Sequence, residues 1–152
     1  MPLLSDQDAA YLRDTFDKQL VNDVTISLFT QRETRLAIPG FEEQAELCGQ
    51  ANAIMEELSA LSDKIHLELF DYRADSETLK AHSVDRVPTA LVGTGDTRPA
   101  RFVGVVAGYE FSTLIQDIID LSTDTIELSD ATQAILNGLT EDLHLQVFVT
   151  PT

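Results

Sequence analysis

The chain has 152 residues and is strongly acidic: 26 Asp and Glu side chains outnumber 10 Lys and Arg, for a formal net charge of -16 at pH 7. This charge repels phosphate backbones and anionic lipid, so we expect neither nucleic acid nor a membrane as partner. A hydrophobic content of 43% suits one compact domain. No apolar run reaches the roughly 20 residues that span a bilayer, and residues 1–6 carry no secretion signal. We therefore predict a soluble, cytoplasmic protein.

Hydrophobic periodicity predicts alternating helices and strands along the first four fifths of the chain. Period-2 alternation marks the strands, and apolar residues three and four apart mark the helices. In chain order we expect a helix over 5–20, a strand over 24–29, a polar loop over 31–40, a helix over 41–61, a strand over 65–69, a polar helix over 76–82, a strand over 89–93, a strand over 98–106 and a helix over 111–121. The turn-forming Gly95 and Asp96 should make the last two strands an antiparallel hairpin.

The end of the chain repeats its beginning. Leu4-Ser5-Asp6 precedes a helical stretch and the strand Asp23–Thr30, and Leu128-Ser129-Asp130 likewise precedes a helical stretch and a strand over Asp142–Thr150. We interpret this as a thioredoxin-sized unit over 1–123 and the first helix and strand of a second copy over 124–152. Chance is the alternative, because Leu-Ser-Asp is a common helix-capping sequence.

Three segments carry a resemblance to a known family. They are LSALSDK (58–64), VDRVPT (84–89), and RFVG with GYEF (101–104 and 108–111). With the element order, they resemble the N-terminal unit of the glutaredoxin-like protein disulfide oxidoreductases, and the N-terminal domain of the alkyl hydroperoxide reductase flavoprotein is similar too. The resemblance implies a thioredoxin-like α/β fold with a mixed four-stranded sheet flanked by helices. It also implies two units in tandem, in which a segment like 147–152 leads into the C-P-Y-C dithiol of the second unit.

This chain departs from that family at its own dithiol. The resemblance aligns Cys48 with the second, buried cysteine of C-x-x-C and Ala45 with the nucleophilic one, so the positions are degenerate and no catalytic residue is expected in this chain. Disulfide exchange needs a thiolate close to a helix N-terminus. Phe41, Glu42 and Glu43 place Cys48 about two turns inside its helix, where we expect a buried core side chain. The alternative is an exposed single-cysteine redox sensor.

A peptide-docking segment is expected beside the degenerate dithiol. Given the resemblance, the Val87-Pro88 bond should be cis, which would turn the preceding backbone outward so that an extended substrate could pair with it. We therefore assign substrate docking to Arg86, Val87, Pro88 and Thr89. The alternative for Pro88 is a strand-start residue at a place where no ladder N–H is needed.

Neither a cofactor nor a metal is expected. The one cysteine excludes an internal disulfide, and three scattered histidines do not complete a zinc site. His66 and His144 fall at polar positions of strands, and His82 falls at the end of a short helix.

These observations lead to one main functional hypothesis and two alternatives. The first is a redox-degenerate N-terminal unit that scaffolds a missing second thioredoxin-like unit and docks protein disulfide substrates for its dithiol. The parent would then be a protein disulfide oxidoreductase of cell redox homeostasis, and this chain alone would be inactive. The alternatives are a non-enzymatic docking domain for a peroxiredoxin or reductase partner, and a sensor that uses Cys48 alone.

Overall fold

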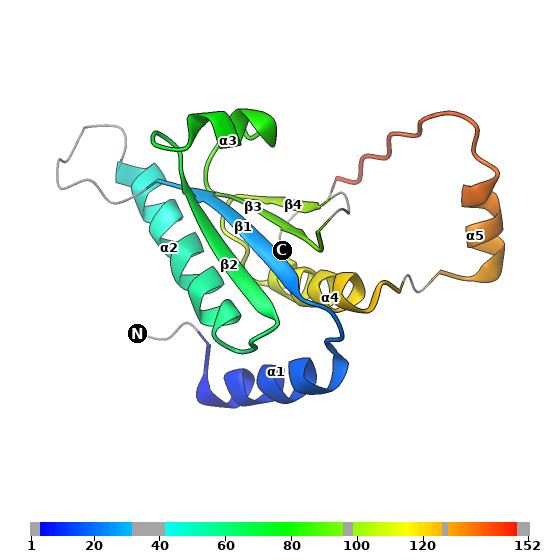
Figure 1. Ribbon diagram of the computed structural model, residues 1–152, viewed down its shortest axis with the longest axis horizontal. Helices are drawn as coiled ribbons and strands as arrows, with labels where there is room; N and C mark the ends of the chain where they lie inside the picture. Colours follow the sequence, from blue (N-terminus) through cyan, green and yellow to red (C-terminus); the bar gives the residue numbers. More distant parts are fainter. Residues whose placement is uncertain (1–3, 32–41, 96–98, 126–127, 149–152) are drawn as a thin grey trace.

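The computed structural model describes residues 4–31, 42–95, 99–125 and 128–148 (Figure 1). Every predicted element of the first unit is present in the predicted order. The loop expected over 31–40 lies outside the described residues except for Gln31. The elements are α1 Asp6–Gln19, β1 Val24–Thr30, α2 Glu42–Ser59, β2 Ile65–Asp71, α3 Ser76–Ala81, β3 Thr89–Gly93, β4 Ala100–Val103, α4 Tyr109–Thr123 and α5 Asp130–Asn137.

The strands form one mixed sheet in the order β2-β1-β3-β4. β1 runs parallel to β2, with Val24 opposite Ile65, and antiparallel to β3, while β3 and β4 form the predicted antiparallel hairpin. A parallel pair needs a crossover connection, which α2 supplies between β1 and β2. The α/β class and the mixed four-stranded sheet flanked by helices are therefore confirmed.

Three helices share the main core on one face of the sheet. Alternate residues of β1, such as Ile26, are fully buried against Met55 of α2 and Ile118 of α4, and Phe16 of α1 joins the same cluster. The intervening residues of β1 point to the opposite face, where Phe29 packs with Leu79 of the short helix α3. Figure 1 accordingly shows α3 and α1 at opposite ends of the molecule.

The end of α4 is tied to the start of β1 by one buried serine. The Ser122 hydroxyl accepts hydrogen bonds from the backbone N–H of Val21 at 2.9 Å and of Asn22 at 3.0 Å, and the Asn22 side-chain amide donates to the Ser122 carbonyl at 2.8 Å. α4 ends one residue later, and Asp124 adopts a left-handed conformation (φ 51°) at its C-cap. The helix predicted over 111–121 therefore extends two residues further at this end.

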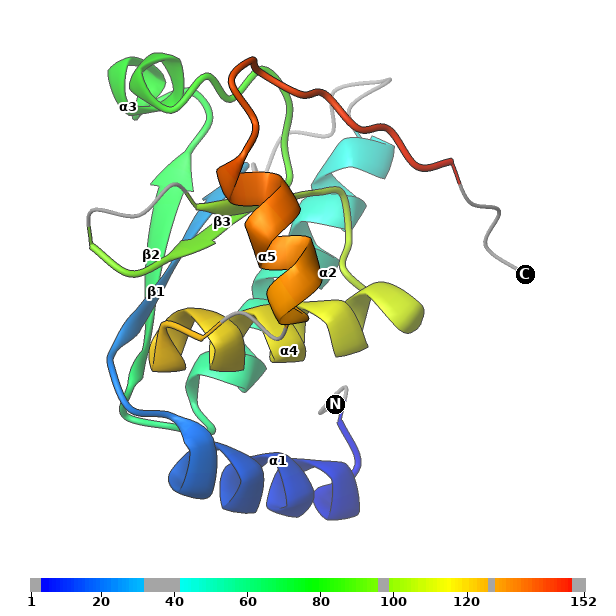
Figure 2. The same cartoon turned by 90° about the vertical axis from the view of Figure 1, so that its right-hand side faces the viewer.

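Of the second copy expected over 124–152, the described residues contain the helix α5 and no strand, and the division into two units stays a prediction. Ser129 caps α5 by accepting from the Thr132 N–H at 3.2 Å, just as Ser5 caps α1 by accepting from the Asp8 N–H at 3.1 Å. The strand expected over 142–150 is not found in its described part, because residues 142–148 are exposed and a strand exists only when a neighbour pairs with it. Figure 1 shows α5 standing to one side of the sheet, and in Figure 2, turned by 90°, α5 lies in front of it.

The strand expected over 98–106 is also shorter than predicted. β4 ends at Val103 because Gly104 has φ 98°, a conformation that turns the chain out of the sheet. Over the described residues, no helix is long and apolar enough to cross a membrane.

Candidate functional site

The first turn of α2 lies beside the residues that precede β3. The Val87-Pro88 peptide bond is cis, as predicted. The side-chain amide of Gln44, one residue before Ala45, donates to the carbonyl of Val87 at 3.4 Å. Residues 43 positions apart in the sequence therefore meet at this end of the sheet.

Cys48 is a buried core side chain, with no exposed surface. It packs in an apolar cluster with Phe29, Leu79 and Val87. Since α2 begins at Glu42, Cys48 lies ~9 Å along the helix axis, where the helix dipole no longer stabilises an anion. The sulfur is thus placed as a hydrophobic group rather than as a nucleophile.

Ala45 lies one turn before Cys48 and is half-buried. It occupies the position at which the resemblance expects the attacking cysteine, and its methyl group offers no lone pair or acidic proton. Together, Ala45 and Cys48 keep the spacing of a dithiol helix without its chemistry.

The four residues expected to dock a substrate differ in what they expose. Arg86 is exposed, whereas the side chains of Val87, Pro88 and Thr89 are buried. The Thr89 hydroxyl donates to the Arg86 carbonyl at 2.8 Å, and the Pro88 carbonyl accepts from the Gly104 N–H at 2.9 Å. A docked peptide would therefore meet the Arg86 side chain and the backbone of this segment, and it would compete with Gln44 for the Val87 carbonyl.

Two guanidinium groups surround the segment in an otherwise acidic protein. Arg86 Nε lies 3.3 Å from Asp85 Oδ1, and this hydrogen bond and charge lower the pKa of the Asp85 carboxyl below its usual range. Arg101, on β4, donates to the carbonyls of His82 at 2.6 Å and Ser83 at 2.9 Å, which fixes the end of α3 against the sheet. The site therefore contains two guanidinium groups and one carboxylate in a chain of net charge -16.

The histidines lie outside any metal-binding arrangement. His66 pairs with Asp23 at 3.1 Å on the surface, His82 caps the end of α3 as predicted and contacts the Phe29 ring, and His144 lies in the exposed segment 142–148. In the part of the chain that the structure describes, no three His, Cys, Asp or Glu side chains are grouped so as to hold a metal ion.

Two contributors to this site escaped the sequence analysis. Gln44 lies between acidic and apolar neighbours in α2, with no local signal for a partner in a distant loop. Arg101 was noted only within the RFVG segment, and its bonds to the end of α3 come from strand pairing that brings β4 to the edge of the sheet. Both depend on long-range geometry that periodicity does not encode.

Comparison with solved structures shows which proteins share this arrangement. No family model and no curated protein matches the sequence. A protein disulfide oxidoreductase from Aeropyrum pernix superposes with a TM-score of 0.70 and 26% identity, over 89% of this chain and 55% of that one. The AhpF component of the Enterococcus faecalis alkylhydroperoxide reductase gives a TM-score of 0.70 at 17% identity, over 90% of this chain and 61% of that one.

A third solved structure, a thioredoxin, shares the fold. A thioredoxin from Nicotiana alata superposes with a TM-score of 0.50 at 15% identity, over 78% of this chain and 88% of that one. The fold is therefore thioredoxin-like, and it matches the disulfide oxidoreductase and the reductase component, as the sequence resemblance implied. The chain spans little more than half the length of those two proteins.

Proposed function

We propose that this chain is a redox-inactive first unit of a two-unit thiol-disulfide oxidoreductase, which supports a second unit whose dithiol performs the exchange. The observation that carries the proposal is the state of the site. The cis-proline segment is retained, but Ala45 replaces the nucleophile and Cys48 is sealed in the core. A unit that keeps the docking geometry and lacks the chemistry suits a supporting role.

The chemistry of exchange explains why this unit would be inactive alone. A thiolate attacks one sulfur of a disulfide, the other sulfur leaves as a thiolate, and a second cysteine must then resolve the mixed disulfide. Here the only cysteine has no exposed surface, and no resolving partner exists in the sequence. Neither half of the reaction can start from this chain.

The end of the chain supports the presence of a second unit. α5 begins with the same capped Leu-Ser-Asp sequence as α1, so Leu136 corresponds to Leu12, which lies in the core of the first unit. Leu136 is instead 45% exposed, and Leu145 and Phe148 are 79% and 88% exposed. A second thioredoxin-like unit would bury these side chains as the first unit buries its own.

This unit would contribute the segment 86–89 to substrate docking. A peptide pairing with the Val87 carbonyl must displace the long hydrogen bond from Gln44, and the neighbouring Arg86 would favour substrates with acidic residues. The proposal thus assigns this unit a part in substrate choice as well as in support.

The test compares this chain with the natural gene product that contains it. Intact mass spectrometry gives the length of that product, and dithiothreitol-driven insulin reduction measures exchange. We expect a longer product with a C-x-x-C that reduces insulin, while residues 1–152 show only the uncatalysed rate. Activity of residues 1–152, or a longer product without a dithiol, would overturn the proposal.

A docking domain for a redox partner is the second candidate, and the exposed Arg86 beside the cis-proline segment favours it. A natural product that ends at Thr152, together with capture of a peroxiredoxin or flavoprotein that is lost on Arg86→Glu substitution, would support this reading. The sensor hypothesis is disfavoured by the burial of Cys48.

A further inference from the structure

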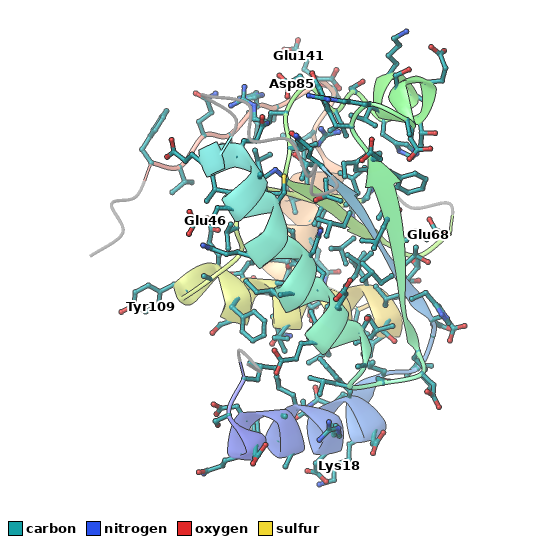
Figure 3. All side chains as sticks on the ribbon, turned by 90° about the vertical axis from the view of Figure 1, so that its left-hand side faces the viewer. Lys18, Glu46, Glu68, Asp85, Tyr109 and Glu141 are labelled. Carbon is teal, nitrogen blue, oxygen red and sulfur yellow. The ribbon has the colours of Figure 1, made fainter. Side chains whose placement is uncertain are left out.

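An apolar groove runs between α1, α2 and α4, at the end of the molecule opposite to α3. It consists of two adjoining hollows of about 290 Å³ and 340 Å³ that share Leu4 and Phe111 as walls. Ile54 of α2 lines one hollow, and Ile115 of α4 lines the other. Figure 3 shows these helices from the side of α2, with α4 passing behind α2 and α1 lying below both. We call this the α1–α4 groove.

The α1–α4 groove has one sign of charge. Asp8 and Glu57 are its charged lining residues, and no Lys or Arg of the described chain lines either hollow. Glu57 also holds the start of the chain, since its Oε1 accepts from the Leu4 N–H at 3.1 Å. An apolar trough edged by carboxylates on a protein of net charge -16 favours a cationic occupant.

One exposed aromatic side chain lines the groove, and a second follows the lining residue Gly108 in the sequence. Tyr11 lines it and is 69% exposed, and Tyr109, which points outward from the first turn of α4 in Figure 3, is 83% exposed. Tyrosine is enriched at the centres of protein interfaces because its ring buries much apolar area while its hydroxyl stays hydrogen-bonded. Two such residues beside one trough indicate a contact surface for a protein rather than a solvated helix face.

We propose that the α1–α4 groove docks a basic amphipathic helix of a partner protein. Apolar side chains at positions i, i+3 or i+4, and i+7 of that helix would fill the two hollows, and flanking Lys or Arg would pair with Asp8 and Glu57. A second copy of this chain is a poor occupant, because two molecules of charge -16 repel each other and the lining offers no basic partner among the described residues. The proposal is independent of the exchange chemistry and of the segment 86–89.

The experiment titrates the protein against a fluorescein-labelled peptide of about four helical turns, with leucines on one helical face and lysines beside them. Two further peptides are matched probes: one has glutamate in place of lysine, and one has the same composition scrambled so that it has no apolar face. We expect binding of the first peptide only, weakened by salt. Equal binding of the scrambled peptide, which carries the same charge, would refute the groove as the site.

Neighbouring positions on α4 provide matched variants. Ser112 and Thr113 are both exposed, but of the two Ser112 lines the groove. Ser112→Arg should weaken binding at least tenfold by filling the trough with a positive charge, whereas Thr113→Arg, with the same change in net charge, should alter it less than twofold. Equal losses in the two variants would mean that the peptide responds to net charge alone, and the proposal would fail.

Sedimentation of the protein without peptide tests whether a second copy of this chain occupies the groove. We expect a single species with the mass of one chain, which Ser112→Arg leaves unchanged. A dimer that Ser112→Arg dissociates would show that a second copy fills the groove, and it would overturn the assignment to a basic partner helix.

Discussion

Substitution of Cys48 by serine should destabilise the fold without removing any function. The thiol has no exposed surface and packs among Phe29, Leu79 and Val87. Serine has nearly the same size, but it would bury a hydroxyl in an apolar cluster, which costs about 1–3 kcal/mol in protein mutational data. A hydrogen bond from the new hydroxyl to the Gln44 carbonyl, one turn back, would place the loss toward the lower end of that range.

Cys48→Ala separates the polar penalty from lost packing. Removing the sulfur forfeits roughly 1 kcal/mol of burial, with a small additional cost for the space left behind. Alanine should therefore be tolerated as well as serine or better, although serine is closer to cysteine in volume. Ala53→Ser, at an exposed position of the same helix, measures the effect of serine on helix propensity alone and should lower stability by no more than about 0.5 kcal/mol.

The assay is urea denaturation monitored by circular dichroism, combined with thiol labelling of the unsubstituted protein by an aromatic disulfide reagent. The native thiol should react only as fast as the protein opens, while the urea-unfolded protein reacts at once. Labelling of the folded protein at the rate of a free cysteine, with its circular dichroism unchanged, would refute the burial argument and restore the sensor hypothesis.

Three further predictions follow from contacts elsewhere. Ser122→Ala leaves the Val21 N–H and the Asn22 carbonyl without their hydroxyl partner, while the Asn22 N–H keeps its bond to the Ser122 carbonyl at 3.1 Å. The substitution should lower the free energy of unfolding by about 1–3 kcal/mol in urea denaturation, whereas Ser112→Ala should leave it unchanged. Burial, and then the charge of Asp120, raise the pKa of the Asp117 carboxyl, so its ionisation opposes folding above the folded-state pKa. Asp117→Asn should therefore stabilise the protein at neutral pH, by no more than about 0.5 kcal/mol after solvent screening. This gain should disappear as the pH falls through the folded-state pKa. Ile135→Lys should leave the midpoint of urea denaturation unchanged, because Ile135 lies on the exposed face of α5.

Local signals predicted the first unit well, and the reasons are physical. Ser5 and Ser129 mark helix starts because a hydroxyl there accepts a backbone N–H within three residues, an interaction contained in the sequence itself. Burial of Cys48 followed from its place on the apolar stripe of α2. The cis bond before Pro88 was predicted through family resemblance, not from the local residues.

The expectations that failed have two causes. Some depend on a partner distant in the sequence, and one depends on a backbone angle that the hydrophobic pattern does not reveal. Alternation over 142–150 shows that the segment could be a strand, but pairing requires a neighbour that the described chain does not provide. The hydrogen bond between Gln44 and the Val87 carbonyl arises only once α2 and the loop before β3 have come together. The early end of β4 depends on the positive φ of Gly104. The apolar residues on either side of Gly104 favoured a strand that continued through it.

The exposed segment 142–148 has a consequence for handling the chain in solution. Its leucines, valine and phenylalanine form an uncovered β-prone stretch, the type of sequence that seeds intermolecular cross-β contacts. Repulsion between molecules of charge -16 opposes such contacts at neutral pH, and it vanishes near the isoelectric point of about 4.2. The same chain should therefore be colloidally stable in neutral buffer and coagulate in mild acid, through residues 142–148 rather than through loss of its core.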